Sequence, residues 1–174
     1  TLDEQNILDN TLLLFTTDHG EMMFERGRLG KGNFNEAVIH VPLIVVPPGS
    51  SSAVHETNGL AETFDIAPTV LDYAAAEIPA SMSASSLRPI VEGHKMGKDI
   101  ALTEYVSNDR SRRAICIRSD RYKYEYWSPD QQERFFDREQ ETLERHNLID
   151  DNLYQDRISE HRKRMIDRLI HTPA

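Results

Sequence analysis

Two adjacent residues near the start of the chain have side chains that could bind a metal ion. Asp18 and His19 follow an apolar run at residues 12–15, and Gly20 comes next. A carboxylate oxygen and an imidazole nitrogen can both ligate a divalent cation, and a glycine lets the backbone approach a ligand closely. An isolated Asp-His pair is more often a turn or a helix cap, so the pair alone leaves both interpretations open.

Lys31 is the third candidate for chemistry. It lies thirteen residues beyond Asp18, between Gly30 and Gly32, in a segment that also carries Arg26. The flanking glycines leave its compact ammonium group room to reach an anion. Most lysines are exposed, so a solvated loop lysine is the simpler interpretation from composition alone.

Two further features are better explained by packing. Tyr122, Tyr124 and Tyr126 could stack on a sugar or a base, but aromatic residues at alternate positions are typical of a half-buried strand. Cys116 stands among apolar neighbours, as a small buried hydrophobic residue would. Because it is the only cysteine, the chain can form neither an intrachain disulfide nor a cysteine zinc cluster.

The composition excludes two classes of partner. The 174 residues carry a net charge of -9, which is the wrong sign for a surface that binds nucleic acid. No apolar run approaches the roughly 20 residues that a bilayer-spanning helix needs. We therefore expect neither a nucleic-acid partner nor a membrane partner.

Short apolar strands must position Asp18 and His19. Residues 12–15 and 41–46 are continuous apolar runs that end in polar loops, which is typical of strands buried on both faces. Open α/β sheets bind ligands at the carboxyl ends of such strands, where Asp18 and His19 lie. Residues 66–73 predict a short helix, with Asp65 as a possible cap.

From about residue 98 the apolar pattern changes to a period of two, which predicts a small antiparallel sheet with polar turns. Its four strands are expected at residues 100–105, 113–118, 122–127 and 133–137. A C-terminal amphipathic helix should cover one face of this sheet. The apolar face of that helix comprises Tyr154, Ile158, Met165, Ile166, Leu169 and Ile170. The sequence therefore predicts an α/β portion at residues 1–96 and a sheet-plus-helix subdomain at residues 97–174.

Taken together, the motifs of this chain resemble the C-terminal portion of a type I, formylglycine-dependent sulfatase of the alkaline phosphatase-like superfamily. Each motif alone is weak, but their order and spacing are specific and they cover nearly the whole chain. They occupy residues 10–21, 30–32, 41–45, 62–71, 86–93, 118–124, 135–137 and 146–148. The resemblance implies the C-terminal part of an α/β sulfatase fold, followed by the small four-stranded sheet and its helix.

The resemblance also implies a divalent cation, usually calcium in that family, held by acidic residues from two parts of the protein. By matching positions, Asp18 and His19 would be metal ligands, and Lys31 would contact the sulfate group. The family makes its formylglycine from a cysteine or serine in a C/S-x-P/A-x-R motif. Cys116 lacks this motif, so the nucleophile and the other metal ligands are expected outside this chain.

The resulting hypothesis is a sulfuric ester hydrolase acting on a small-molecule or carbohydrate sulfate ester, with this chain as its C-terminal portion. Alone, the chain should be inactive and should not retain calcium, because two ligands are fewer than the roughly six to eight that calcium prefers. Exposed apolar strands at residues 12–15 and 41–46 should make it self-associate. The alternatives are a phosphonate or phosphate ester hydrolase of the same superfamily and a non-catalytic binding or assembly module. The resemblance implies a periplasmic or extracellular location, but the sequence leaves a cytoplasmic location possible as well.

Overall fold

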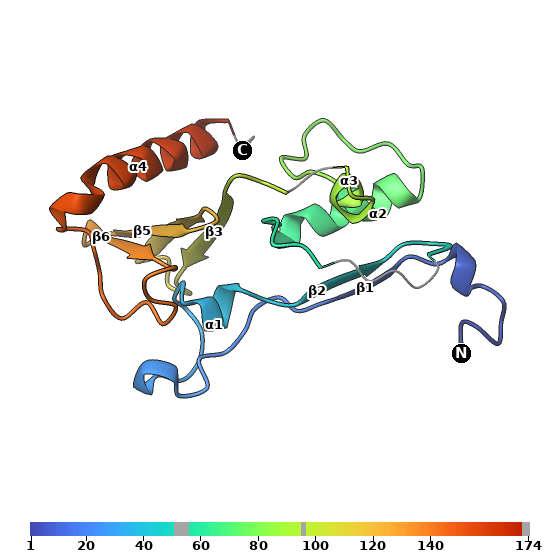
Figure 1. Ribbon diagram of the computed structural model, residues 1–174, viewed down its shortest axis with the longest axis horizontal. Coiled ribbons are helices and arrows are strands. Elements are labelled where there is room, and N and C mark those ends of the chain that lie inside the picture. The colour runs from blue at the N-terminus through green and yellow to red at the C-terminus, as the bar shows by residue number, and fades with distance from the viewer. Residues whose placement is uncertain (51–55, 95–96, 172–174) are drawn as a thin grey trace. The chain divides into compact units, whose positions relative to one another are not determined.

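The computed structural model describes residues 1–50, 56–94 and 97–171, which form two compact units (Figure 1). The first unit comprises Thr1–Asp18 and Val41–Lys98, and the second comprises His19–His40 and Asp99–Ala174. The domain boundary at residue 96 stays a prediction, because residues 95–96 lie outside the described ranges. None of the helices in those ranges is long and apolar enough to cross a membrane.

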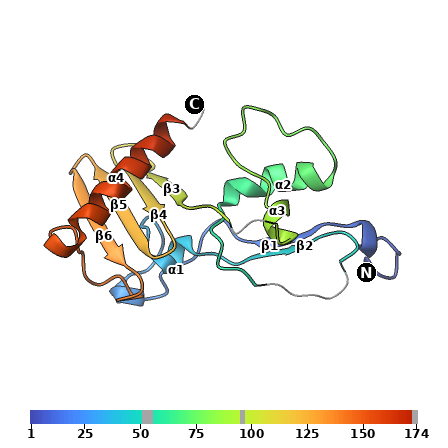
Figure 2. The same cartoon turned by 45° about the horizontal axis from the view of Figure 1, so that its top comes forward.

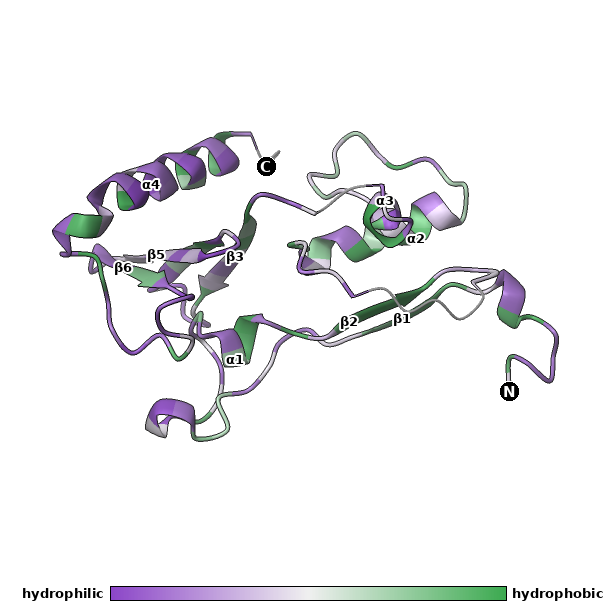
Figure 3. Cartoon of the chain, viewed as in Figure 1, coloured by the Kyte–Doolittle hydropathy of each residue, from purple (hydrophilic) through white to green (hydrophobic). Residues whose placement is uncertain are grey.

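The first unit contains a two-stranded antiparallel ribbon. β1 (Leu13–Thr16) pairs with β2 (Leu43–Val46), and Phe15 lies opposite Ile44. Both strands are rich in hydrophobic residues (Figure 3). Phe15 nevertheless keeps 61% of its surface exposed and Ile44 keeps 54%. The strands are therefore not buried on both faces in this chain, and the expected exposure of apolar strand residues at 12–15 and 41–46 is confirmed for Phe15 and Ile44.

Short helices complete the first unit. The predicted helix at residues 66–73 is present with the predicted bounds, as α2 (Ile66–Tyr73). The other helical segments of this unit are the 3-10 turns Leu8–Asn10 and Thr63–Asp65 and the single helical turn α3 (Arg88–Val91).

Asp65 is the polar centre of the first unit. The sequence predicts it as a cap of α2, but its side chain makes no capping bond there, because it turns back along the preceding 3-10 turn. Its carboxylate accepts the N–H groups of Glu62 and Ser85 at 2.8 and 3.0 Å and binds Lys98 Nζ at 2.7 Å. The side chain is fully buried, so these partners offset the loss of its hydration.

Replacing Asp65 with alanine should lower the free energy of unfolding by about 3 kcal/mol, because the Lys98 ammonium and two N–H groups lose a buried partner. Chemical denaturation followed by circular dichroism measures this loss. Asp3→Ala removes an exposed carboxylate of the same unit and should change stability by less than about 0.5 kcal/mol. Equal stabilities of the two variants would contradict the central role of Asp65.

The second unit is a four-stranded antiparallel sheet in the order β3-β4-β5-β6. The strands are β3 (Ala101–Val106), β4 (Arg113–Arg118), β5 (Tyr122–Ser128) and β6 (Gln132–Asp137). The helix α4 (Gln155–Ile170) lies across one face of this sheet (Figure 2). The predicted small sheet and its covering helix are thus confirmed. The remaining helical segments are the single turn α1 (Glu36–Ile39) and the 3-10 turns Glu25–Gly27 and Asn152–Tyr154.

The buried face of α4 differs in part from the prediction. Ile158, His161 and Met165 are buried, since residues three and four apart share a helix face. A histidine therefore occupies a place where an apolar residue is expected, and its Nε2 lies 3.0 Å from Ser119 Oγ. Burial lowers the pKa of His161. Three residues predicted on the buried face are exposed instead: Ile166, Leu169 and Ile170.

The two faces of β5 have different chemistry, because successive residues of a strand point to opposite sides. The face toward α4 carries Tyr122, Tyr124 and Tyr126, which pack in the cluster that includes Ile158 and Met165. Sheet packing is therefore confirmed as the role of the tyrosine stripe. The opposite face carries three buried residues: Lys123, Glu125 and Trp127.

Residues 19–40 contribute to the core on that opposite face. The Phe34 ring packs on Trp127 with 5.1 Å between ring centroids. Cys116 is buried in the same cluster, and burial raises the pKa of its thiol well above the usual value. The segment between the two predicted strands at 12–15 and 41–46 is therefore attached to the C-terminal sheet.

Candidate functional site

His19 and Lys31 lie side by side in the second unit. Lys31 Nζ is 2.5 Å from His19 Nε2, and His19 Nδ1 is 2.7 Å from the carbonyl oxygen of Gly20. Because a carbonyl only accepts hydrogen bonds, the ring proton belongs on Nδ1, which leaves the Nε2 lone pair facing the ammonium group. The fold thus brings together two of the three residues that the sequence singled out.

Asp18 is the last residue of the first unit, and its side chain is exposed. Thr17 Oγ1 donates a hydrogen bond to Asp18 Oδ1 at 3.2 Å. Within the described ranges, no three His, Cys, Asp or Glu side chains gather as a metal site. The role of Asp18 and His19 as metal ligands therefore stays a prediction.

Close packing explains the glycine that follows His19. The Gly20 N–H donates to the carbonyl of Val38 at 2.7 Å. A Cβ atom on Gly20 would lie 2.0 Å from the carbonyl oxygen of Ala37, which is far inside van der Waals contact. Any side chain at this position would therefore force His19 away from α1.

The backbone on both sides of Lys31 is set by glycines. Gly30 and Gly32 have φ values of +82° and +91°, a region that residues with a side chain rarely adopt. Gly30 is also tied into its loop, because its carbonyl accepts the Met22 N–H at 3.2 Å and its own N–H donates to the Glu21 carboxylate. We call residues 30–35 the site loop.

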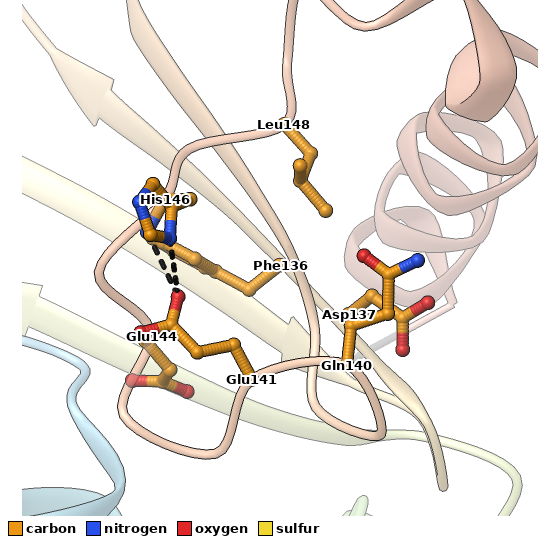
Figure 4. Close-up of a pocket in the computed structure, with 7 residues that line it drawn as sticks. All are labelled: Phe136, Asp137, Gln140, Glu141, Glu144, His146 and Leu148. Carbon is orange, nitrogen blue, oxygen red and sulfur yellow. Dashed lines mark hydrogen bonds and ion pairs between the residues drawn. The ribbon is translucent and has the colours of Figure 1, made fainter.

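A separate cavity of about 350 Å³ lies beside β6 (Figure 4). It is lined by the end of β6 and by residues between 140 and 148, including Glu141 and His146, whose Nδ1 lies 2.9 Å from Glu141 Oε2. A hydrogen bond from Arg121 holds the pKa of the lining residue Asp137 below its usual value. None of the three predicted site residues lines this cavity.

Sequence reasoning missed a set of buried charges beneath the site loop. Lys123, Glu125 and Glu144 are buried in the second unit, and Glu36 contacts Lys123 from α1. A lysine and a glutamate at alternate positions of a predicted strand would have been the signal for one polar, buried face. That signal is weak, because the same pattern is typical of a solvated strand face.

The comparisons with known proteins indicate one family. The model of the C-terminal part of N-sulphoglucosamine sulphohydrolase matches residues 25–171. Choline-sulfatase from Rhizobium meliloti is 35% identical over 153 residues, which make up 86% of this chain and 29% of that protein. The chain therefore spans about a third of the length of such relatives.

Solved structures support the same family. A structure described as a 2-O GAG sulfatase has a TM-score of 0.85 at 26% identity, covering 94% of this chain and 37% of the other. Phosphonate monoester hydrolase from Silicibacter pomeroyi has a TM-score of 0.83 at 25% identity, covering 98% of this chain and 38% of the other. These likenesses confirm the predicted fold class, the C-terminal part of a sulfatase fold.

Proposed function

We propose that this chain, which belongs to the family of the N-sulphoglucosamine sulphohydrolase C-terminal domain, is the C-terminal portion of a sulfuric ester hydrolase. In this proposal Asp18 and His19 are ligands of a divalent cation, and Lys31 binds the sulfate group. The observation that carries the proposal is the 2.5 Å contact between His19 Nε2 and Lys31 Nζ. It places a possible metal ligand, the imidazole lone pair, beside a positively charged group that can bind an anion. The matching family model is that of a C-terminal part, which supports a contribution from another portion of the protein.

The donor set of this chain fits part of a cation site. The Nδ1 proton of His19 is directed to the Gly20 carbonyl, which is the arrangement typical of metal-bound histidines. Asp18 would add a carboxylate oxygen, the ligand that calcium prefers, whereas a nitrogen ligand suits so hard a cation less well. A cation held there would withdraw charge from a sulfate oxygen. The other ligands and the formylglycine nucleophile would come from outside this chain.

Lys31 would bind and stabilise the ester sulfate. Its ammonium group can donate three hydrogen bonds, and its charge would stabilise the negative charge that grows on oxygen as the S–O bond breaks. His19 Nε2 can accept but not donate, so His19 would not protonate the leaving group. Since one lone pair holds one partner at a time, Lys31 would turn from His19 to the sulfate when His19 ligates the cation.

The proposal is tested with a polypeptide that joins this chain to a formylglycine-bearing N-terminal portion, here called the joined sulfatase. The likeness to a phosphonate monoester hydrolase favours one competing function. Sulfate and phosphonate esters of the same phenol should therefore be compared. We expect the sulfate ester to have the higher kcat/KM, by at least about tenfold, which corresponds to roughly 1.4 kcal/mol in the barrier. A higher value for the phosphonate ester would reassign the function.

The physiological substrate is proposed to be a sulfate ester of a small molecule or a carbohydrate. The printed names of the relatives include both kinds, a choline-sulfatase and a 2-O GAG sulfatase. Turnover of choline sulfate and of a 2-O-sulfated disaccharide by the joined sulfatase distinguishes the two kinds.

The 174-residue chain alone should self-associate, because Phe15 and Ile44 expose one apolar face of the ribbon formed by β1 and β2. Light scattering should find a mass above 20.0 kDa that falls on dilution. The double variant Phe15→Thr with Ile44→Thr should shift the chain toward the monomer. A monodisperse monomer of the unaltered chain would contradict this prediction.

A further inference from the structure

We infer that Lys123 is a positioning residue for Lys31, which fastens the site loop to the sheet of the second unit. This inference rests on the proposed role of Lys31 in binding sulfate. Lys123 belongs to β5 and has no exposed surface. A buried lysine is costly unless its charge is paired and its N–H groups are bonded, so its partners indicate its role.

The Lys123 ammonium has a backbone partner and several carboxylate partners. It donates to the carbonyl oxygen of Phe34 in the site loop and pairs with the carboxylate of Glu144. Carboxylate oxygens of Glu36 and Glu125 each lie 3.9 Å from Nζ. We call Lys123, Glu36, Glu125 and Glu144 the buried charge cluster.

The same cluster holds the residues that follow Phe34. The Asn35 side-chain amide donates to Glu144 Oε2 at 3.3 Å. Glu36 Oε2 lies 2.9 Å from a guanidinium nitrogen of Arg138, in the turn after β6. Three consecutive residues are therefore fastened by directed polar contacts, beginning three positions after Lys31.

Apolar packing alone would not fix the loop in this way. The contact of Phe34 with Trp127 buries a ring, but it does not set the direction of the Phe34 carbonyl. A hydrogen bond from Lys123 sets that direction, because its strength depends on geometry. The same hydrogen bond therefore holds the backbone that leads to Lys31. Without that bond the backbone would be easy to displace, because the glycines around Lys31 are conformationally permissive.

Hydrogen exchange of the 174-residue chain tests the fastening. Lys123→Met keeps the side-chain length but removes the ammonium, so deuterium uptake by peptides that cover residues 28–36 should speed up by about tenfold or more. Peptides from β3 and β4 should change by less than about twofold, because their ladder is intact. Lys163→Met, at an exposed position of α4, is the matched control and should change neither region.

Unchanged uptake in the site loop of folded Lys123→Met overturns the inference, and so does an equal increase in every peptide, which is the mark of global destabilisation. Should Lys123→Met fail to fold, Glu144→Gln decides the matter. It keeps the shape of the cluster, removes one negative charge and replaces one of the two acceptor oxygens that serve Asn35 and Lys123 with an amide NH2 group. In that variant, faster deuterium uptake confined to residues 28–36 supports the inference, and unchanged uptake in those residues overturns it.

Activity of the joined sulfatase tests the link to Lys31. Lys123→Met should lower kcat/KM by about 10- to 100-fold, but by less than about twofold when Lys31→Ala is already present, since residues that act together are not additive. An equal loss in both backgrounds overturns the positioning role. Full activity of Lys31→Ala alone would instead defeat the proposed function, and the exchange result would still decide whether Lys123 fastens the loop.

Discussion

Asp18→Ala is expected to lower kcat/KM of the joined sulfatase by at least about 1,000-fold, because a lost cation ligand removes several kcal/mol of charge stabilisation from the transition state. The carboxylate is the only oxygen ligand that our proposal draws from this chain. Initial rates with an aryl sulfate, measured over a series of calcium concentrations, give the size of the loss. Added calcium should restore part of the activity, since the substitution weakens binding of the cation.

The control for Asp18→Ala is Asp9→Ala, which removes another exposed carboxylate that precedes β1. It should keep activity within about twofold. A second readout is the shift in melting temperature on adding calcium, which should shrink in Asp18→Ala and persist in Asp9→Ala. An active Asp18→Ala protein with an unchanged calcium shift would remove Asp18 from the proposed site. By the same reasoning, calorimetry of the 174-residue chain alone should detect no micromolar calcium binding.

Lys31→Ala is expected to lower kcat/KM by about 100- to 1,000-fold, the usual cost of removing one group that stabilises developing charge. The loss should appear mainly in kcat, because the charge on oxygen is greatest in the transition state. Lys31→Arg should recover only part of it, since a planar guanidinium does not replace a compact ammonium between two glycines. Steady-state kinetics of the three proteins measure both parameters.

Lys163→Ala serves as the control for Lys31→Ala, because it removes an exposed lysine on α4. A loss of equal size in this control would indicate a general electrostatic effect. Lys31→Ala activity within about twofold of the unaltered protein would contradict the role of Lys31 and would favour a non-catalytic binding or assembly module.

The sequence determines those parts of the fold that depend on neighbouring residues. The strand at residues 113–118 and the helix at residues 66–73 occur with their predicted bounds. Each of these elements is signalled by residues that are close together in the sequence. The strand is signalled by an apolar period of two, and the helix by a short apolar pattern. The motif around Asp18, His19 and Lys31 is likewise local, which is why it identifies candidate residues and a family before any contact is known.

The tertiary structure decides which distant groups become partners. The pairing of His19 with Lys31 depends on a loop that folds back between them, and the burial of Lys123 depends on Phe34, 89 positions away. Periodicity assigns Lys123 to a strand face but does not say what covers that face. The exposed face of Phe15 and the buried His161 of α4 have the same origin. Burial is a property of what packs against a residue, and that partner is chosen by long-range contacts that local sequence patterns do not encode.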